Sequence, residues 1–230
     1  MLKLFIALIA SAFLLSGCEG LFGKESGQRG ALPGKRSDVF SAERALKADA
    51  TAVTTTLEIP QAEDVTDWVQ PGGSLSRVHG NVAFSGSANE AWSTSIGTGS
   101  HGDGALTATP IIAAGKVYTV DASGNACAFS AQNGDRVWCV NVPQQRPEDA
   151  NIAGAGLAYD QGKIIVTTSY GFVVQLDASS GKQIWQRNLL TPVRSAPVIA
   201  DGKIYVTSMN NSVQEISFAD GSLGWTHSGI

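Results

Sequence analysis

The chain has 230 residues, a formal net charge of −4 and a sequence pI near 5.3. Its basic residues are scattered and form no stripe of Lys and Arg, so the charge pattern argues against a nucleic-acid partner. Glycine is abundant, with 26 residues, and the apolar stretches are short and rich in Val and Ile, which is typical of an all-β protein with many turns.

The first 17 residues have the pattern of a signal peptide. Residues 4–15 are an uninterrupted run of apolar and small residues, too short to span a bilayer. The run ends in Leu-Ser-Gly-Cys at residues 15–18, which resembles the lipobox of bacterial lipoproteins, where the Cys thiol is acylated. An ordinary secretory signal cleaved after residue 12 is the alternative, but its apolar core would be about six residues, against the usual ~7–15. We therefore predict a lipoprotein signal peptide over residues 1–17 and a lipid on Cys18.

A lipid on Cys18 implies a protein that is anchored to a membrane without spanning it. In sorted lipoproteins an Asp after the acylated Cys favours the inner membrane, so Glu19 favours the outer membrane and a domain that faces the periplasm. Residues 18–63 carry Gly, Pro, Ser and mixed charges with little apolar periodicity. This composition predicts a flexible tether between the lipid and the folded domain.

Regularly spaced tryptophans mark an internal repeat over residues 64–230. Trp92, Trp138, Trp185 and Trp225 are separated by 46, 47 and 40 residues. Three Gly-Lys pairs, at residues 115–116, 162–163 and 202–203, keep the same 47 and 40. A period of this size indicates a solenoid, a propeller or an array.

Each repeat unit predicts a series of short strands. A first strand follows a Pro or Gly, a Gly-Lys turn comes next, and β-branched strands such as "KVYTVD", "KIIVTT" and "KIYVTS" follow the turn. Three strands are clear in each unit, and we expect the segment between the Trp and the next Pro or Gly to supply the fourth. Four-stranded antiparallel units at this spacing are propeller blades. The predicted fold class is an all-β propeller of three to four blades, an incomplete ring because rings have about four to eight.

The repeated tryptophans are expected to be structural. A large aromatic at a fixed point of each blade is expected to be buried against the neighbouring blade. Three of the tryptophans follow a glycine by four residues, and a glycine there allows a turn with positive φ. These glycines are Gly134, Gly181 and Gly221.

The pattern of Pro, Gly-Lys, aromatic-Val and Gly-x-x-x-Trp resembles the pyrroloquinoline-quinone-type repeat. Within that superfamily the chain resembles the BamB family, the lipoproteins of the outer-membrane β-barrel assembly machinery. Three features carry the resemblance: the lipobox, "DWVQPGGSLSRVHGN" at residues 67–81, and "VRSAPVIADGKIYV" at residues 193–206. The resemblance implies a non-catalytic scaffold that helps to fold and insert outer-membrane proteins. The family forms an eight-bladed ring, so this chain is expected to be a fragment.

The resemblance also implies a partner, the periplasmic domains of BamA, and a surface that binds it. The family docks through loops on one face of the propeller, including the loop before the Ser-Ala-Pro strand. Here that loop is "NLLTPVRSAP", and Leu189, Leu190 and Arg194 are the candidate partner-binding residues. An apolar patch with an Arg is common at binding hot spots. The family's Arg does not align cleanly with Arg194.

Quinoprotein dehydrogenases share this type of repeat, so a fragment of such an enzyme is one alternative. Many enzymes of that class stack a pair of adjacent Cys on the cofactor, whereas no two Cys are adjacent here. Asp121 and Asp177 follow predicted strands, where Asp is ordinarily a turn former. A further alternative is an envelope propeller that binds peptides or glycans.

Other motifs lack the context that their chemistry requires. His79, His101 and His227 match no zinc spacing. "GTGSHG" at residues 97–102 fits G-x-G-x-x-G but precedes a strand rather than a helix, so we interpret it as a loop between blades. We therefore predict no catalytic, cofactor-binding or metal site, and no small-molecule substrate.

Cys127 and Cys139 remain once Cys18 is assigned to the lipid. They flank "AFSAQNGDRVW", in which Asn133-Gly134 is a strong hairpin signal, so the two Cys would face each other on paired strands. An oxidising compartment would permit a disulfide. Two free thiols buried as small apolar groups are the alternative, because the geometry of a cross-strand disulfide is demanding.

The lipobox makes a prediction about the mature protein. We expect mass spectrometry to find a mature chain that begins at an acylated Cys18, because the lipid is attached through that thiol. A Cys18→Ser variant should keep its signal peptide or lose its membrane attachment. A bare Cys18, or a mature chain that begins elsewhere, would contradict the prediction.

Overall fold

The computed structural model describes residues 56, 58–84, 86, 89–100, 106–142, 155–193 and 195–229. The predicted signal peptide, Cys18 and nearly all of the predicted tether lie outside these residues. Glu58–Ile230 form a compact unit, which therefore begins earlier than the predicted boundary at residue 64. The reason is a backbone pairing in which Glu63 donates to Asn81 and accepts from Ala83, at 2.8 and 2.9 Å. Among the described residues, no helix is long and apolar enough to cross a membrane.

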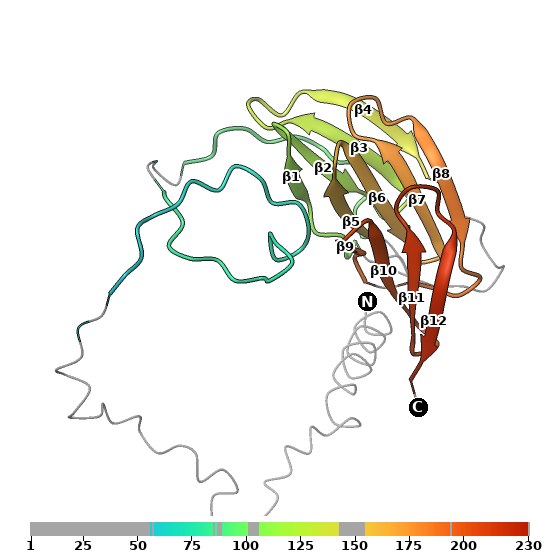
Figure 1. Ribbon diagram of the computed structural model, residues 1–230. Helices are drawn as coiled ribbons and strands as arrows, with labels where there is room; N and C mark the ends of the chain where they lie inside the picture. The colour runs from blue at the N-terminus through green and yellow to red at the C-terminus, as the bar shows by residue number, and fades with distance from the viewer. Residues whose placement is uncertain are drawn as a thin grey trace, which may run out of the picture. The chain divides into compact units, whose positions relative to one another are not determined.

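The described residues form three four-stranded antiparallel sheets, which lie side by side as successive blades (Figure 1). The predicted all-β fold of an incomplete propeller is confirmed. Blade 1 consists of β1 (Ile111–Ala113), β2 (Lys116–Val120), β3 (Asn125–Ser130) and β4 (Arg136–Asn141). Blade 2 consists of β5 (Ala155–Asp160), β6 (Lys163–Thr168), β7 (Phe172–Asp177) and β8 (Gln183–Asn188). Blade 3 consists of β9 (Val198–Ala200), β10 (Lys203–Ser208), β11 (Ser212–Ser217) and β12 (Leu223–Ser228).

The fourth strand of each blade is the strand that carries the tryptophan. Trp138, Trp185 and Trp225 lie on β4, β8 and β12, each at the end of its sheet's strand order. The expectation that a segment after the Trp supplies the fourth strand is wrong. Between β8 and β9, the described residues make only an isolated bridge, from Val193 to Ser208. The strand that ends on the Trp pairs with the third strand directly, so no further strand is needed.

The first hairpin of every blade turns through a residue pair with positive φ. In blade 1 the pair is Ala114-Gly115, with φ of 49° and 71°, and blades 2 and 3 have the same arrangement. Two successive residues with positive φ form the turn that matches the twist of paired strands. The repeated Gly-Lys pairs of the sequence therefore mark the last turn residue and the first residue of the second strand.

Cys127 on β3 and Cys139 on β4 are directly opposite each other and form a disulfide bond. Their Cα atoms are 4.1 Å apart. Cys127 is buried and Cys139 lies on the exposed fourth strand, so the bond joins the outermost strand of blade 1 to its interior.

The apolar core lies between blades rather than within them. One cluster fills the space between blades 1 and 2 and includes Tyr118, Leu157 and Val174. A second cluster, with Ile165, Ile204 and others, fills the space between blades 2 and 3. Blade 2 is thus buried on both faces, and its strands β6 and β7 are almost continuously buried. In blade 3, burial alternates along β11, because one face of that blade has no neighbour among the described residues.

An indole rests on a glycine at each blade boundary, and Trp92 makes the same contact ahead of blade 1. A Cβ added to the glycine would come within 2.6–2.7 Å of the indole Cε3. Each indole Nε1 also donates a hydrogen bond to the backbone oxygen three residues before that glycine. The pairs are Trp92 with Ala131 and Gly134 at 3.1 Å, Trp138 with Ala178 and Gly181 at 3.1 Å, and Trp185 with Phe218 and Gly221 at 3.3 Å.

These glycines therefore have two functions. Gly134, Gly181 and Gly221 have φ between 71° and 76°, which fits the expected turn. Each is also the seat for the tryptophan of the preceding unit, which the sequence analysis did not anticipate. We call this arrangement of a glycine and the carbonyl three residues before it an indole seat.

Full burial of the tryptophans is not observed. Trp92, Trp138 and Trp185 are half-buried, and Trp225 is 44% exposed. On an outermost strand, one side of the ring meets the next blade while the other remains near solvent. Trp225 differs further, because its Nε1 donates to Glu215 of its own blade, at 2.8 Å.

The indole seats predict unequal effects of tryptophan removal. We expect Trp185→Ala to lower the free energy of unfolding by about 2–3 kcal/mol, less than the ~3–5 typical of a fully buried Trp. The matched control, Trp225→Ala, should cost about 1 kcal/mol or less, because its indole occupies no seat. Chemical denaturation would measure both. Equal losses in the two variants would contradict the seat.

Candidate functional site

The predicted partner-binding loop has one strongly exposed apolar residue. Leu190 is 87% exposed, whereas Leu189 packs against the core cluster between blades 2 and 3. Arg194 lies outside the described residues. The expected patch of Leu189 with Leu190 is therefore not formed, because Leu189 points into the protein, and Leu190 remains as the exposed candidate.

Leu190 is held in place although it is exposed. Its φ is 57°, a conformation that costs a non-glycine residue of order 1 kcal/mol or more. The side chain of Asn188 accepts the Leu190 backbone N–H at 2.8 Å. Leu189 donates its own N–H to Gly171 at 2.8 Å, and Val193 bridges to β10. The loop is thus fixed on both sides of a single protruding leucine.

A second feature is a segment that lies against the inner ends of two blades. Trp68 exchanges two backbone hydrogen bonds with Ile112 of β1, at 2.6 and 3.0 Å. The next residue, Val69, accepts from Tyr159 of β5 at 2.8 Å. First strands of neighbouring blades contact each other, β1 with β5 and β5 with β9, so they lie toward the axis of the blades. This segment therefore occupies backbone groups that would otherwise face the axis.

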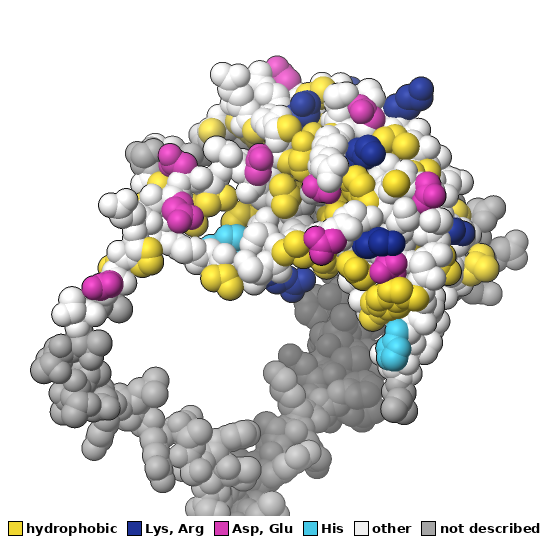
Figure 2. All heavy atoms as spheres, viewed as in Figure 1, with side chains coloured by type: hydrophobic (Ala, Val, Ile, Leu, Met, Phe, Trp, Pro, Cys, Tyr) yellow, Lys and Arg dark blue, Asp and Glu magenta, His cyan; other side chains and the backbone are white. Residues whose placement is uncertain are grey.

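Surface hollows among the described residues are shallow and lined mainly by polar groups. An open groove of about 580 Å³ lies on the last hairpin of blade 2, lined by Asp177, Ser179, Ser180, Lys182, Gln183 and Ile184. A smaller hollow of about 190 Å³ adjoins Trp68 and includes Asp67, Gly73 and His79. Within the described ranges, no three His, Cys, Asp or Glu side chains are arranged as metal ligands. Figure 2 shows acidic and basic side chains interspersed over one face, without a region of single charge.

Asp121 is the one buried carboxylate among the described residues, at 2% exposure. It accepts backbone hydrogen bonds from Thr98, Ser123 and Asn125 at 2.7–2.9 Å, and another from the Asn125 side chain at 2.9 Å. Burial alone would raise its pKa, but these hydrogen bonds together lower the pKa below the usual value. A carboxylate with four donors is satisfied, so Asp121 fixes the turn between β2 and β3, as its position at a strand end predicts.

Asp121 also explains a glycine of the "GTGSHG" motif. Gly97 has a φ of 112°, and a Cβ there would lie 2.4 Å from the carboxylate of Asp121. The glycine lets the segment before blade 1 approach the turn closely enough for the Thr98 N–H to reach Asp121. The sequence gave no signal for this contact, because Gly97 and Asp121 are far apart in the chain.

Asp177, in contrast, is an exposed turn residue. The hydroxyls of Ser179 and Ser180 and the backbone N–H of Ser180 donate to it at 2.5–2.8 Å. These hydrogen bonds, that of the Ser179 side chain first, lower the pKa of Asp177 to about 2. The predicted assignment as a turn former thus fits both carboxylates, although only Asp121 joins two segments.

Comparison with known proteins decides the family. The family profile described as "Outer membrane protein assembly factor BamB" matches residues 64–152 and 145–230. The chain belongs to this family. Outer membrane protein assembly factor BamB of Yersinia pestis is 25% identical over 144 residues, which cover 61% of this chain and 36% of that protein. The chain thus spans about a third of that relative, and the resemblance found in the sequence is confirmed.

Quinoprotein enzymes are also similar to the chain. The 1-butanol dehydrogenase (cytochrome c) of Thauera butanivorans is 29% identical over 109 residues, or 43% of this chain and 16% of that enzyme. The structure of quinohemoprotein alcohol dehydrogenase ADHIIG from Pseudomonas putida HK5 matches 74% of this chain and 29% of that one, with a TM-score of 0.58 and 18% identity. At that identity the match shows the propeller fold alone.

Asp121 predicts a dependence of stability on pH. Because its pKa is lower in the folded than in the unfolded chain, the carboxylate stabilises the fold above the unfolded value near 3.8. This stabilisation is lost as the pH falls through the folded-state pKa. We expect Asp121→Asn to lower the free energy of unfolding at pH 7 by about 1–3 kcal/mol. The difference from wild type should shrink below pH 3.8.

Denaturation of both proteins between pH 2 and pH 7 would measure this effect. Asp135→Asn is the matched control, since Asp135 is an exposed turn residue of the same blade. It should leave the free energy at pH 7 little changed. A pH-independent difference between wild type and Asp121→Asn would show that the charge of Asp121 is not the cause.

Proposed function

We propose that the chain is part of a non-catalytic scaffold for the assembly of outer-membrane proteins. Membership of the BamB family is the observation that carries the proposal. In this proposal a lipid on Cys18 anchors the protein to the outer membrane, and the blades face the periplasm. Its partner is the periplasmic part of BamA, the central component of the assembly machinery, as the resemblance to the family implies.

Two structural features support a scaffold over an enzyme. The backbone around Trp68 pairs with the inner edges of blades 1 and 2, toward the axis where propeller enzymes keep their cofactor. The most deeply buried carboxylate, Asp121, has its oxygens occupied by hydrogen bonds within the turn. Proteins that act as scaffolds instead present rigid surface groups, and the strained, anchored Leu190 is such a group.

A fragment of a quinoprotein dehydrogenase is the second candidate, favoured by the similarity to 1-butanol dehydrogenase. The two functions differ in a direct experiment. Purified protein would be incubated with pyrroloquinoline quinone and calcium, and then assayed for binding of the quinone and for alcohol oxidation with an artificial electron acceptor. Binding of the quinone with oxidation of alcohol would favour the enzyme and contradict the scaffold.

Leu190 gives the scaffold proposal a residue-level prediction. We expect Leu190→Glu to weaken binding to the periplasmic domains of BamA by about tenfold or more, which corresponds to about 1.4 kcal/mol. Val137→Glu is the control, because Val137 is also an exposed apolar residue, at 47%, but lies on β4. Surface plasmon resonance with immobilised BamA domains would measure both. Wild-type affinity of the Leu190 variant would contradict this binding surface.

A further inference from the structure

Each blade carries one row of three side chains across its second, third and fourth strands. The members of a row lie opposite one another on neighbouring strands, and the last member is always the tryptophan. The rows are Tyr118–Ala128–Trp138 in blade 1, Ile165–Gln175–Trp185 in blade 2 and Tyr205–Glu215–Trp225 in blade 3.

The first two rows bind the next blade in the same way. In blade 1, the Tyr118 hydroxyl and the Trp138 Nε1 both donate to the Ala178 carbonyl, at 3.2 and 3.1 Å. In blade 2, Gln175 Nε2 and Trp185 Nε1 both donate to the Phe218 carbonyl, at 2.7 and 3.3 Å. Two donors from one row thus share the carbonyl of one indole seat.

The third row has the geometry of a docked row although nothing among the described residues covers it. The rings of Tyr205 and Trp225 are 6.1 Å apart with an angle of 45° between them. The rings of Tyr118 and Trp138, which blade 2 covers, are 6.0 Å apart with an angle of 46°. The aromatic pair of blade 3 is therefore already arranged as in a formed interface.

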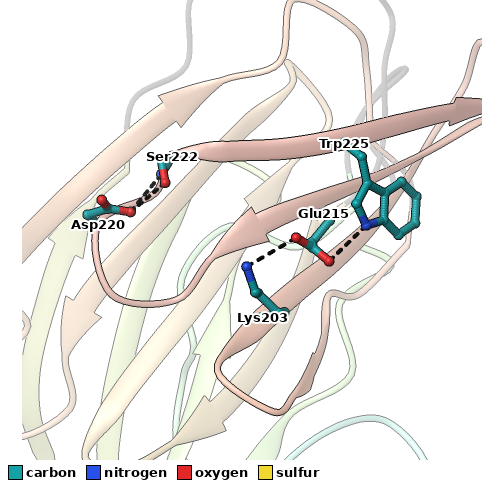
Figure 3. A network of polar contacts seen from close by, with 5 residues as sticks. All are labelled: Lys203, Glu215, Asp220, Ser222 and Trp225. Carbon is teal, nitrogen blue, oxygen red and sulfur yellow. Dashed lines mark hydrogen bonds and ion pairs between the residues drawn. The ribbon is translucent and has the colours of Figure 1, made fainter.

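Figure 3 shows what occupies the indole donor of Trp225 at present. Glu215 accepts the Trp225 Nε1 at 2.8 Å through one oxygen, and its other oxygen pairs with Lys203 Nζ at 3.1 Å. Glu215 thus takes the place of the carbonyl that an adjoining blade supplies in the other two interfaces. Its side chain is only 14% exposed, so the carboxylate is close against the row.

We infer that the Tyr205–Glu215–Trp225 row is a docking surface for one further four-stranded repeat unit that brings a vacant indole seat. The seat consists of a glycine with positive φ and a backbone carbonyl three residues before it. On docking, Trp225 exchanges Glu215 for that carbonyl, the Tyr205 hydroxyl becomes the second donor, and Glu215 keeps Lys203. This inference does not depend on the proposed role in outer-membrane assembly.

A second copy of this chain does not fit the same surface. The described residues hold three indole seats, at Gly134, Gly181 and Gly221, and all three are filled by Trp92, Trp138 and Trp185. The occupant must therefore bring a seat that is not already filled. This requirement distinguishes a separate repeat unit from self-association.

The test supplies such a unit within one polypeptide. Residues 189–229 would be duplicated directly after Ser228, so that the appended repeat follows the natural connection and carries a vacant Gly221 seat. The appended copy carries Trp225→Phe, which leaves the original Trp225 as the reporter. Both chains would be labelled with 5-fluorotryptophan, and the ¹⁹F resonance of Trp225 would be assigned with Trp225→Phe in the 230-residue chain.

We expect the Trp225 resonance to lose its H₂O/D₂O isotope shift in the extended chain, because the appended seat covers the ring. Trp225→Ala should lower the unfolding temperature of the extended chain more than that of the 230-residue chain. Glu215→Gln should raise the unfolding temperature of the extended chain relative to its effect in the shorter one, because glutamine there adds a donor to the seat carbonyl, as Gln175 does.

Two results would overturn the inference. An unchanged isotope shift of Trp225 together with equal effects of Trp225→Ala in both chains would show that the row does not dock a repeat. A concentration-dependent dimer of the 230-residue chain in sedimentation velocity, abolished by Trp225→Ala, would assign the row to a second copy instead. A monomer at all concentrations supports the separate repeat unit.

Discussion

The contact of an indole with a glycine across a blade boundary is the constraint on which the rest of this structure depends. The indole Cε3 of Trp185 lies where a Cβ at Gly221 would be, so no other residue type fits at that glycine. The indole also donates to the Phe218 carbonyl, which fixes the neighbouring sheet along and across its strands. Because the same contact recurs in the chain, one local rule sets how each blade adjoins the next.

Burial follows from this stacking. Blade 2 has a neighbour on each side, so its β6 and β7 bury successive residues on both faces. Blade 3 has a neighbour on one side, and burial along β11 alternates. The most apolar strands are therefore those of the middle blade, and the aromatic groups of Tyr205 and Trp225 lie on a face that remains accessible.

The polar groups of the described residues act mainly to hold segments together. Asp121 gathers hydrogen bonds from its own turn and from Thr98, and this satisfies its charge in a buried place. Leu190 is the opposite case, an apolar side chain held in solvent by a strained backbone. A protein with satisfied internal charges and rigid exposed groups is suited to binding other proteins, which agrees with membership of the BamB family.

The sequence by itself determined the repeat, the strand and turn types, the family and the opposition of Cys127 and Cys139, because all of these depend on local spacing and residue type. It misassigned the fourth strand and overestimated the burial of the tryptophans, because both depend on how outermost strands meet their neighbours. It also gave no indication that Leu189 and Leu190 point in different directions. Only the tertiary structure decided that a turn glycine is the seat for the preceding Trp and that Gly97 makes room for Asp121. Those contacts join residues about 24 to 42 positions apart, across boundaries that no local pattern describes.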